Sequence, residues 1–100
     1  MAERPGKLEE VWNLIRKVPK GSVATYGDIA ALAGCTARYV GFALRRSPPG
    51  LRLPWHRILA ACGRIALPGD SGLTQRLRLE QEGVAFRGRR VDLSKHRWRP

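Results

Sequence analysis

The sequence predicts a single, mainly α-helical domain with small β hairpins, organised around a winged helix-turn-helix. Two short helical segments joined by a tight glycine turn indicate the helix-turn-helix. Short extended segments bounded by turn residues follow them and indicate the β hairpins. One hundred residues, 43% of them hydrophobic, is the size of a single folded domain, so we expect residues 1–100 to form one unit.

The first predicted element is an amphipathic helix from about Lys7 to Val18. Its apolar side chains recur at i, i+3, i+4 and i+7, which places them on one buried stripe. They are Leu8, Val11, Trp12 and Ile15. Pro19 and the glycine that follows two residues later end the helix.

A second, short helix is predicted over residues 29–33. Thr25 and Asp28 have the spacing of a capping box, in which each side chain satisfies a backbone amide of the other residue. Gly34 stands where a helix commonly ends.

A third helix is predicted over residues 37–46, with Thr36 as its N-terminal cap. Arg38, Gly41 and Arg45 share one face of this helix. That face is cationic and unobstructed, and we expect it to contact DNA because arginine binds phosphate and fits duplex grooves. The alternative is that both arginines are merely solvated helix residues.

The second half of the chain begins with an extended segment, residues 51–54. Residues 56–61 and 64–67 are predicted to pair as a small hairpin across Cys62 and Gly63. Residues 68–72 contain proline, aspartate, serine and two glycines, and this composition predicts a loop.

The last predicted helix spans Leu73 to about Glu82, and Gly83 occupies the position of a C-terminal capping glycine. The tail, residues 84–100, is rich in arginine and alternates loosely between polar and apolar residues. Trp98 is predicted to anchor this tail to the domain.

The chain is strongly basic, which makes nucleic acid the leading class of partner. It has 19 Lys and Arg residues against 8 Asp and Glu, a formal net charge of +11. It contains neither an apolar stretch long enough to span a bilayer nor a secretory signal. We therefore expect a cytoplasmic protein, associated with the nucleoid in a bacterium, with no membrane partner.

The two cysteines, Cys35 and Cys62, do not form a CxxC pair and are not near a histidine at metal-ligand spacing. No metal and no cofactor are predicted. We interpret both cysteines as small packed thiols, with a disulfide between them left open as an alternative.

Four blocks of sequence, in order, resemble the DNA-binding domain of the O6-alkylguanine-DNA alkyltransferases. They are residues 18–30, residues 37–41, the Pro54-Trp55-His56-Arg57-Ile58 block and the Glu82-Gly83 pair. In that family the third block reads Pro-Cys-His-Arg-Val, and its cysteine accepts the alkyl group. Trp55 stands at the cysteine position here, and the resulting Pro-Trp-His-Arg motif is similar to that of the alkyltransferase-like proteins, the non-enzymatic branch.

The resemblance implies the fold of the alkyltransferase C-terminal domain and a protein that is not an enzyme. An indole has no thiolate and no basic nitrogen that could attack an alkyl carbon. The implied function is to bind duplex DNA containing O6-alkylguanine, to flip the damaged base into a pocket without removing the alkyl group, and to flag the lesion for nucleotide excision repair. Nucleotide excision repair proteins are the implied partners, and we expect a monomer.

The resemblance also implies roles for single residues. Arg38 matches an arginine finger that enters the base stack, and Tyr26 matches a tyrosine that presses on the phosphate beside the rotated nucleotide. The predicted DNA-binding residues are Tyr26, Thr36, Arg38, Gly41 and Arg45. The predicted pocket residues are Tyr26, Pro54, Trp55, His56, Arg57 and Ser71. No catalytic role is predicted for His56, Arg57 or Glu82, and the alternative for Tyr26 is a half-buried aromatic at a helix start.

Two other functions remain open on the sequence. Cys62 or Cys35 could act as an unusual alkyl acceptor, which would make the protein an enzyme. The helix-turn-helix could instead read an unmodified DNA sequence, as a transcription regulator does.

Overall fold

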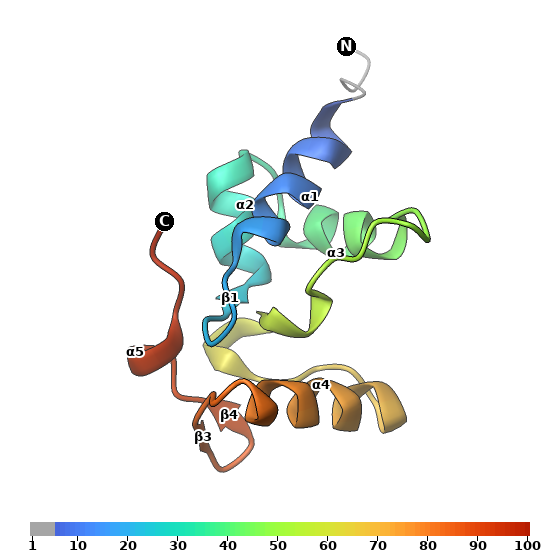
Figure 1. Ribbon diagram of the computed structural model, residues 1–100. Coiled ribbons are helices and arrows are strands. Elements are labelled where there is room, and N and C mark those ends of the chain that lie inside the picture. The colour runs from blue at the N-terminus through green and yellow to red at the C-terminus, as the bar shows by residue number, and fades with distance from the viewer. Residues whose placement is uncertain (1–5) are drawn as a thin grey trace.

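The computed structural model describes residues 6–100 (Figure 1). Helices α1 (Gly6–Lys17), α2 (Tyr26–Ala33) and α3 (Ala37–Arg45) pack together in the N-terminal half. They surround a hydrophobic cluster that includes Val11, Ile15 and Ile29, each of which is fully buried. The three helices predicted in this half of the chain are confirmed.

The helix-turn-helix is fixed by local caps. The Thr25 hydroxyl accepts a hydrogen bond from the Asp28 amide (3.0 Å), and Asp28 accepts one from the Thr25 amide (3.1 Å), as the capping box predicts. Gly34 ends α2 in the left-handed conformation, with φ of 70°, which costs glycine little because it has no Cβ. Thr36 then caps α3.

A short parallel strand pair joins the two halves of the molecule. Strand β1 (Ala24–Thr25) pairs with β2 (Ile58–Leu59), and Ala24 lies opposite Ile58. Successive side chains of a strand point to opposite faces. Accordingly, Ala24 and Ile58 belong to the N-terminal cluster, whereas Val23 and Leu59 belong to a second cluster in the C-terminal half.

The C-terminal half contains one long helix and several short elements. In Figure 1, α4 lies across the end of the molecule opposite α1, with β3, β4 and α5 beside it. The elements are the single-turn 3-10 helices η1 (Trp55–Arg57) and η2 (Ala61–Gly63), helix α4 (Gly69–Gln81), strands β3 (Phe86–Arg87) and β4 (Arg90–Val91), and α5 (Leu93–His96). None of the helices in residues 6–100 has the length and hydrophobicity needed to span a bilayer.

The hairpin predicted between residues 56–61 and 64–67 is wrong. Only Ala60 and Arg64 bridge each other, across η2, and β2 pairs with the distant β1 instead. The buried, apolar Ile58–Leu59 segment is completed by a partner more than thirty residues away, which local turn signals do not reveal. The antiparallel hairpin of the molecule is β3–β4, within the loosely alternating tail.

The loop predicted over residues 68–72 is also wrong, because α4 begins at Gly69. Asp70 in the first turn interacts favourably with the positive end of the helix dipole. Gly72 is buried against the Leu67 carbonyl oxygen, which a Cβ would strike. Gly72 therefore allows close packing at the start of α4 and does not mark a loop.

The tail is held to the domain near Trp98, as predicted. The Trp98 side chain packs against the N-terminal cluster, and its amide donates to the Val23 carbonyl (2.7 Å). The Val23 amide in turn donates to the His96 carbonyl (2.8 Å). Arg97 pairs with Asp28 (3.0 Å), so the tail also supports the start of α2.

Candidate nucleic-acid interface

Helix α3 presents the predicted cationic face. Arg38 and Arg45 are exposed, and they line a shallow cleft of about 380 Å³ together with Thr36, Tyr39 and Phe42. The Thr36 hydroxyl is committed to the helix, because it accepts a hydrogen bond from the Tyr39 amide (3.0 Å). Three of the residues predicted to bind DNA, Thr36, Arg38 and Arg45, thus line one cleft.

Gly41 and Tyr26 both lie close to Arg45. A Cβ at Gly41 would be 3.7 Å from an Arg45 guanidinium nitrogen, so Arg45 extends back over the helix surface at this glycine. Tyr26 is the first residue of α2 and is half-buried against the N-terminal cluster. Burial raises the pKa of the Tyr26 phenol, and the positive charge of Arg45 offsets part of this increase. The phenol is therefore neutral at physiological pH and can donate a hydrogen bond.

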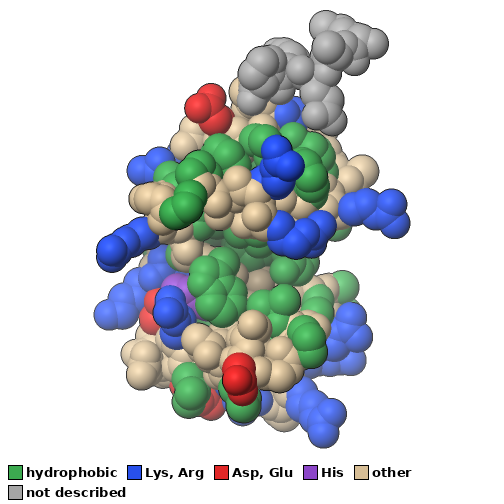
Figure 2. Space-filling model, turned by 90° about the vertical axis from the view of Figure 1, so that its right-hand side faces the viewer, with side chains coloured by type: hydrophobic (Ala, Val, Ile, Leu, Met, Phe, Trp, Pro, Cys, Tyr) green, Lys and Arg blue, Asp and Glu red, His purple; other side chains and the backbone are tan. Residues whose placement is uncertain are grey.

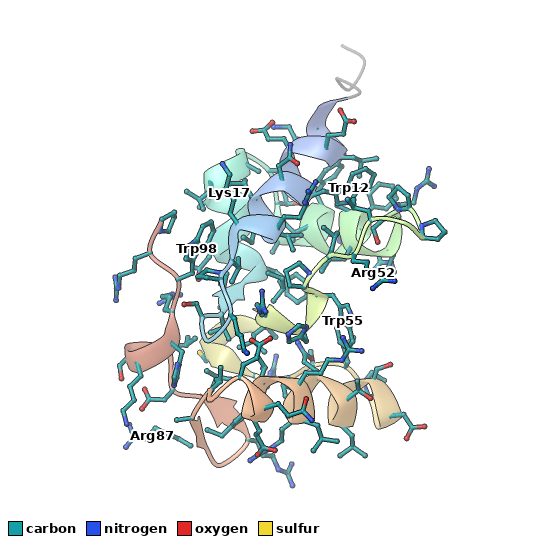
Figure 3. All side chains as sticks on the ribbon, in the orientation of Figure 1. Trp12, Lys17, Arg52, Trp55, Arg87 and Trp98 are labelled. Carbon is teal, nitrogen blue, oxygen red and sulfur yellow. The ribbon has the colours of Figure 1, made fainter. Side chains whose placement is uncertain are left out.

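Trp55 is half-buried on η1, between α3 and α4, on the same side of the molecule as Arg52 (Figure 3). It lines a cleft of about 410 Å³ whose other walls are leucines, two arginines and one serine. The lining residues are Leu44, Ser47, Leu51, Arg52, Leu53, Trp55 and Arg78. Figure 2 shows this side of the molecule, where hydrophobic side chains border a hollow with Lys or Arg side chains around it.

The other predicted pocket residues surround Trp55 to different extents. Pro54, His56 and Arg57 line an adjoining cleft of about 400 Å³, which shares Arg52, Leu53 and Arg78 with the first cleft. Ser71 is exposed in the first turn of α4, and neither Ser71 nor Tyr26 is among the residues that line the Trp55 cleft.

His56, Arg57 and Glu82 form a hydrogen-bonded cluster. His56 Nε2 donates to Glu82 Oε2 (2.8 Å), and Arg57 donates to both carboxylate oxygens (2.7 and 3.0 Å). Burial alone would raise the pKa of Glu82, but hydrogen bonds from Arg57, His56 and the Gly21 amide outweigh it and hold the pKa at about 2. Arg57 also donates to the Val18 carbonyl (3.0 Å), so the cluster connects η1 to α4 and to the end of α1.

Three residues of this region are missing from the sequence-based prediction. Gln75 is 2% exposed and donates to the carbonyls of His56 (3.2 Å) and Ile58 (2.9 Å), which fixes the backbone around η1. Arg78 lies over the Trp55 ring, 5.7 Å from its centroid, and Arg52 lines the same cleft. Counting helical turns back from Glu82 would have placed residues 75 and 78 on the face of α4 that meets η1.

The cysteines do not contribute to the clefts described above. Cys35 is half-buried, and burial raises the pKa of its thiol, which disfavours the reactive thiolate. Cys62 is exposed in η2, with φ of 65°, and also lies outside the residues that line the Trp55 cleft. Among residues 6–100 no group of three or more His, Cys, Asp or Glu side chains could hold a metal ion.

The chain is similar to proteins that handle alkylated or flipped DNA bases. A sequence model of the family described as "6-O-methylguanine DNA methyltransferase, DNA binding domain" matches residues 7–84. The "DNA base-flipping protein" of Escherichia coli K12 is 44% identical over 93 residues, which cover 90% of this chain and 72% of that protein. "Alkyltransferase-like protein 1" of Schizosaccharomyces pombe is 34% identical over 100 residues, which cover 91% of this chain and 93% of that protein.

The fold is similar to that of the S. pombe protein crystallised in complex with damaged DNA containing O6-carboxymethylguanine. The TM-score is 0.80 at 30% sequence identity, and the match covers 99% of this chain and all of that chain. The predicted fold class, a mainly α domain like the DNA-binding domain of the alkyltransferases, is confirmed.

Proposed function

Because the chain belongs to the family of the 6-O-methylguanine DNA methyltransferase DNA-binding domain, we propose that it binds duplex DNA containing O6-alkylguanine without repairing it. The damaged base is rotated out of the duplex and held in the cleft beside Trp55. The alkyl group stays on the base, so the protein is a sensor of the lesion.

The observation that carries this proposal is the place of Trp55 in the fold. By the resemblance of the Pro-Trp-His-Arg motif, Trp55 stands where the alkyltransferases have their acceptor cysteine, and it lines the cleft between α3 and α4. Its indole offers a flat apolar surface to an alkyl group and no nucleophile. The half-buried Cys35 and the exposed Cys62 lie outside the lining of that cleft, which supports binding without alkyl transfer.

The helix-turn-helix supplies the groups needed to rotate the base. Extruding a nucleotide costs a few kcal/mol of unstacking, and less when the base pair is already damaged. We assign to Arg38 the role of filling the gap in the base stack, since a guanidinium can stack and donate hydrogen bonds at once. Tyr26, neutral and close to Arg45, is assigned to the phosphate beside the rotated nucleotide.

A protein that binds a lesion without removing it requires other proteins to complete the repair. We propose nucleotide excision repair as the route, a proposal that rests on the resemblance to the alkyltransferase-like branch. The same resemblance supports a monomer bound to DNA in the cytoplasm or nucleoid.

The test is a binding competition between duplexes of identical sequence with and without O6-methylguanine, repeated in several sequence contexts. We expect the modified duplex to bind at least about tenfold more tightly in every context, since rotation of a weakly paired base costs less. Equal affinity for both duplexes would contradict the proposal. A strong preference for one unmodified sequence would indicate a transcription regulator.

Intact-mass measurement of the protein after the same incubation separates sensing from repair. We expect the protein mass to be unchanged and the O6-methylguanine to be recovered from the DNA. A gain of one methyl group would indicate alkyl transfer to Cys35 or Cys62 and would overturn the non-enzymatic part of the proposal.

A further inference from the structure

Two arginines without an acidic partner converge on the cleft beside Trp55. Arg52 and Arg78 both line this cleft and the adjoining one. By contrast, Arg57, which lines only the adjoining cleft, is paired with Glu82. Neither Arg52 nor Arg78 makes an ion pair with any of residues 6–100, so their charges are available to an anionic ligand.

The two charges reach the cleft from separate elements. Arg78 belongs to α4, and its guanidinium lies 5.7 Å from the centroid of the Trp55 ring, within the range of a cation–π contact. Arg52 belongs to the extended segment between α3 and η1, and Figure 3 shows it on the same side of the molecule as Trp55. An oxyanion in the cleft could therefore accept hydrogen bonds from two directions.

The remaining walls of the cleft are apolar apart from Ser47. Leu44, Leu51 and Leu53 contribute them together with the indole. Such a site suits a group with a short apolar link and a negatively charged end. A neutral alkyl group would use only the apolar walls and leave both guanidinium groups without a partner.

We infer that Arg52 and Arg78 make the protein selective for O6 adducts that end in a carboxylate over neutral adducts of the same size and shape. This inference rests on the proposed function, since it requires the O6 substituent to lie beside Trp55. Guanidinium groups bind carboxylates through short, charge-assisted hydrogen bonds, about twice as strong as those between neutral groups. The charge of the adduct, in addition to its size, then determines affinity.

The experiment compares three duplexes of one sequence, containing guanine, O6-carboxymethylguanine or O6-(carbamoylmethyl)guanine. The two adducts have the same size and shape, but the carboxymethyl group ends in a carboxylate and the carbamoylmethyl group ends in a neutral amide. Affinities are measured by fluorescence anisotropy for the wild type, Arg52→Gln, Arg78→Gln and Arg89→Gln. Arg89, an exposed arginine in the β3–β4 turn, provides a control that removes the same charge outside the clefts described above.

We expect the wild type and Arg89→Gln to bind the carboxymethyl duplex about tenfold more tightly than the carbamoylmethyl duplex, as a charge-assisted bond predicts. In Arg78→Gln and in Arg52→Gln this ratio falls to about threefold or less, with affinity for the carbamoylmethyl duplex nearly unchanged. Melting temperatures confirm that the variants are folded.

The outcomes separate the inference from the proposed function. If the wild type binds both adducts equally but more tightly than guanine, the inference is wrong and the proposed function stands. If no adduct is preferred to guanine, the proposed function itself is wrong. If Arg52→Gln and Arg78→Gln weaken binding of all three duplexes by the same factor, the arginines bind backbone phosphate and the inference is overturned.

Discussion

Arg38 and Arg45 lie on the same exposed face of α3, yet their surroundings differ. The Arg45 guanidinium lies near Gly41, and its charge acts on the Tyr26 phenol. Arg38 is in the first turn of α3, on the rim of the shallow cleft. Arg45 is thus positioned to support Tyr26, whereas Arg38 can extend into a duplex.

We predict that Arg38→Ala lowers discrimination between O6-methylguanine and guanine about tenfold, which corresponds to about 1.4 kcal/mol. This is close to the lower end of what a hydrogen bond to a charged group contributes. The ratio of the two dissociation constants, measured by anisotropy at fixed salt, reports this effect.

Arg90→Ala provides the matched control, since Arg90 is an exposed arginine on β4. It should weaken binding to both duplexes similarly and leave the ratio intact. If both variants lose discrimination to the same degree, Arg38 contributes only general charge.

At the scale of elements, Glu82 connects η1 to the end of α4. Its side chain is 11% exposed and accepts hydrogen bonds from His56 and Arg57, so the short helix that carries Trp55 depends on it for its position. The other nitrogen of the His56 ring, Nδ1, is buried and has no hydrogen-bond partner among the described residues. Glu82 therefore provides the side-chain hydrogen bond that orients the imidazole, beside the edge-to-face contact of this ring with Trp55.

The depressed pKa of Glu82 predicts a pH dependence of stability. The carboxylate favours the folded state above its unfolded pKa, near 4.5, and this contribution is lost as the pH falls toward about 2. The difference between these two pKa values corresponds to roughly 3 kcal/mol of folding free energy. The free energy of unfolding of the wild type should therefore fall by about this amount, relative to Glu82→Gln, between pH 5 and pH 2.

Urea unfolding of both proteins at several pH values measures this difference, and the comparison with Glu82→Gln removes the contributions of the other carboxylates. Asp28, whose pKa is also lowered by Arg97 despite burial, is present in both proteins. Parallel curves for the two proteins over this pH range would show that the Glu82 pKa is not depressed by folding.

Elements fixed by neighbouring residues could be predicted from the sequence, whereas those fixed by distant partners could not. Thr25, Asp28, Gly34 and Thr36 act within a few residues of themselves, so the sequence predicts the end of α2 and both ends of α3 to within one residue. The start of α2 lies three residues before the predicted one. Strand β2 acquires its partner from a segment more than thirty residues earlier, and its pairing was missed.

The candidate site divides in the same way. The motif residues Trp55, His56 and Arg57 follow from the sequence because they are contiguous. Arg78 and Gln75 lie inside the predicted helix, but the apolar pair that predicts this helix, Leu73 and Leu77, is exposed and does not mark its buried face. The face of α4 that meets η1 carries a glutamine and an arginine, which a search for apolar periodicity does not select.

At the scale of the whole molecule, acidic residues neutralise the positive charge in some regions and leave it unpaired in others. Asp28, Glu80 and Glu82 are paired with Arg97, Arg76 and Arg57, respectively. Helix α3 contains no acidic residue, and Arg38, Arg45 and the following Arg46 are exposed. The helix expected to enter DNA therefore carries cations that the protein itself does not neutralise.

We predict that affinity for unmodified duplex DNA falls steeply with salt. If Arg38, Arg45 and Arg46 each neutralise one phosphate, the logarithm of the association constant should fall with the logarithm of salt concentration with a slope of about −3. Anisotropy titrations between about 50 and 200 mM salt measure this slope. Replacing Arg38 and Arg46 with glutamine should reduce its magnitude by about 2, and a wild-type slope near zero would contradict the prediction.

The parallel pairing of β1 with β2 also bears on how the chain folds. The pair closes a loop that contains α2 and α3 entirely, and its side chains contribute to both hydrophobic clusters. Closing such a loop costs chain entropy that is recovered only when both clusters pack. We therefore expect α3 and the Trp55 cleft to form together in one cooperative transition, so that a chain with α3 in place and the cleft unformed should not accumulate.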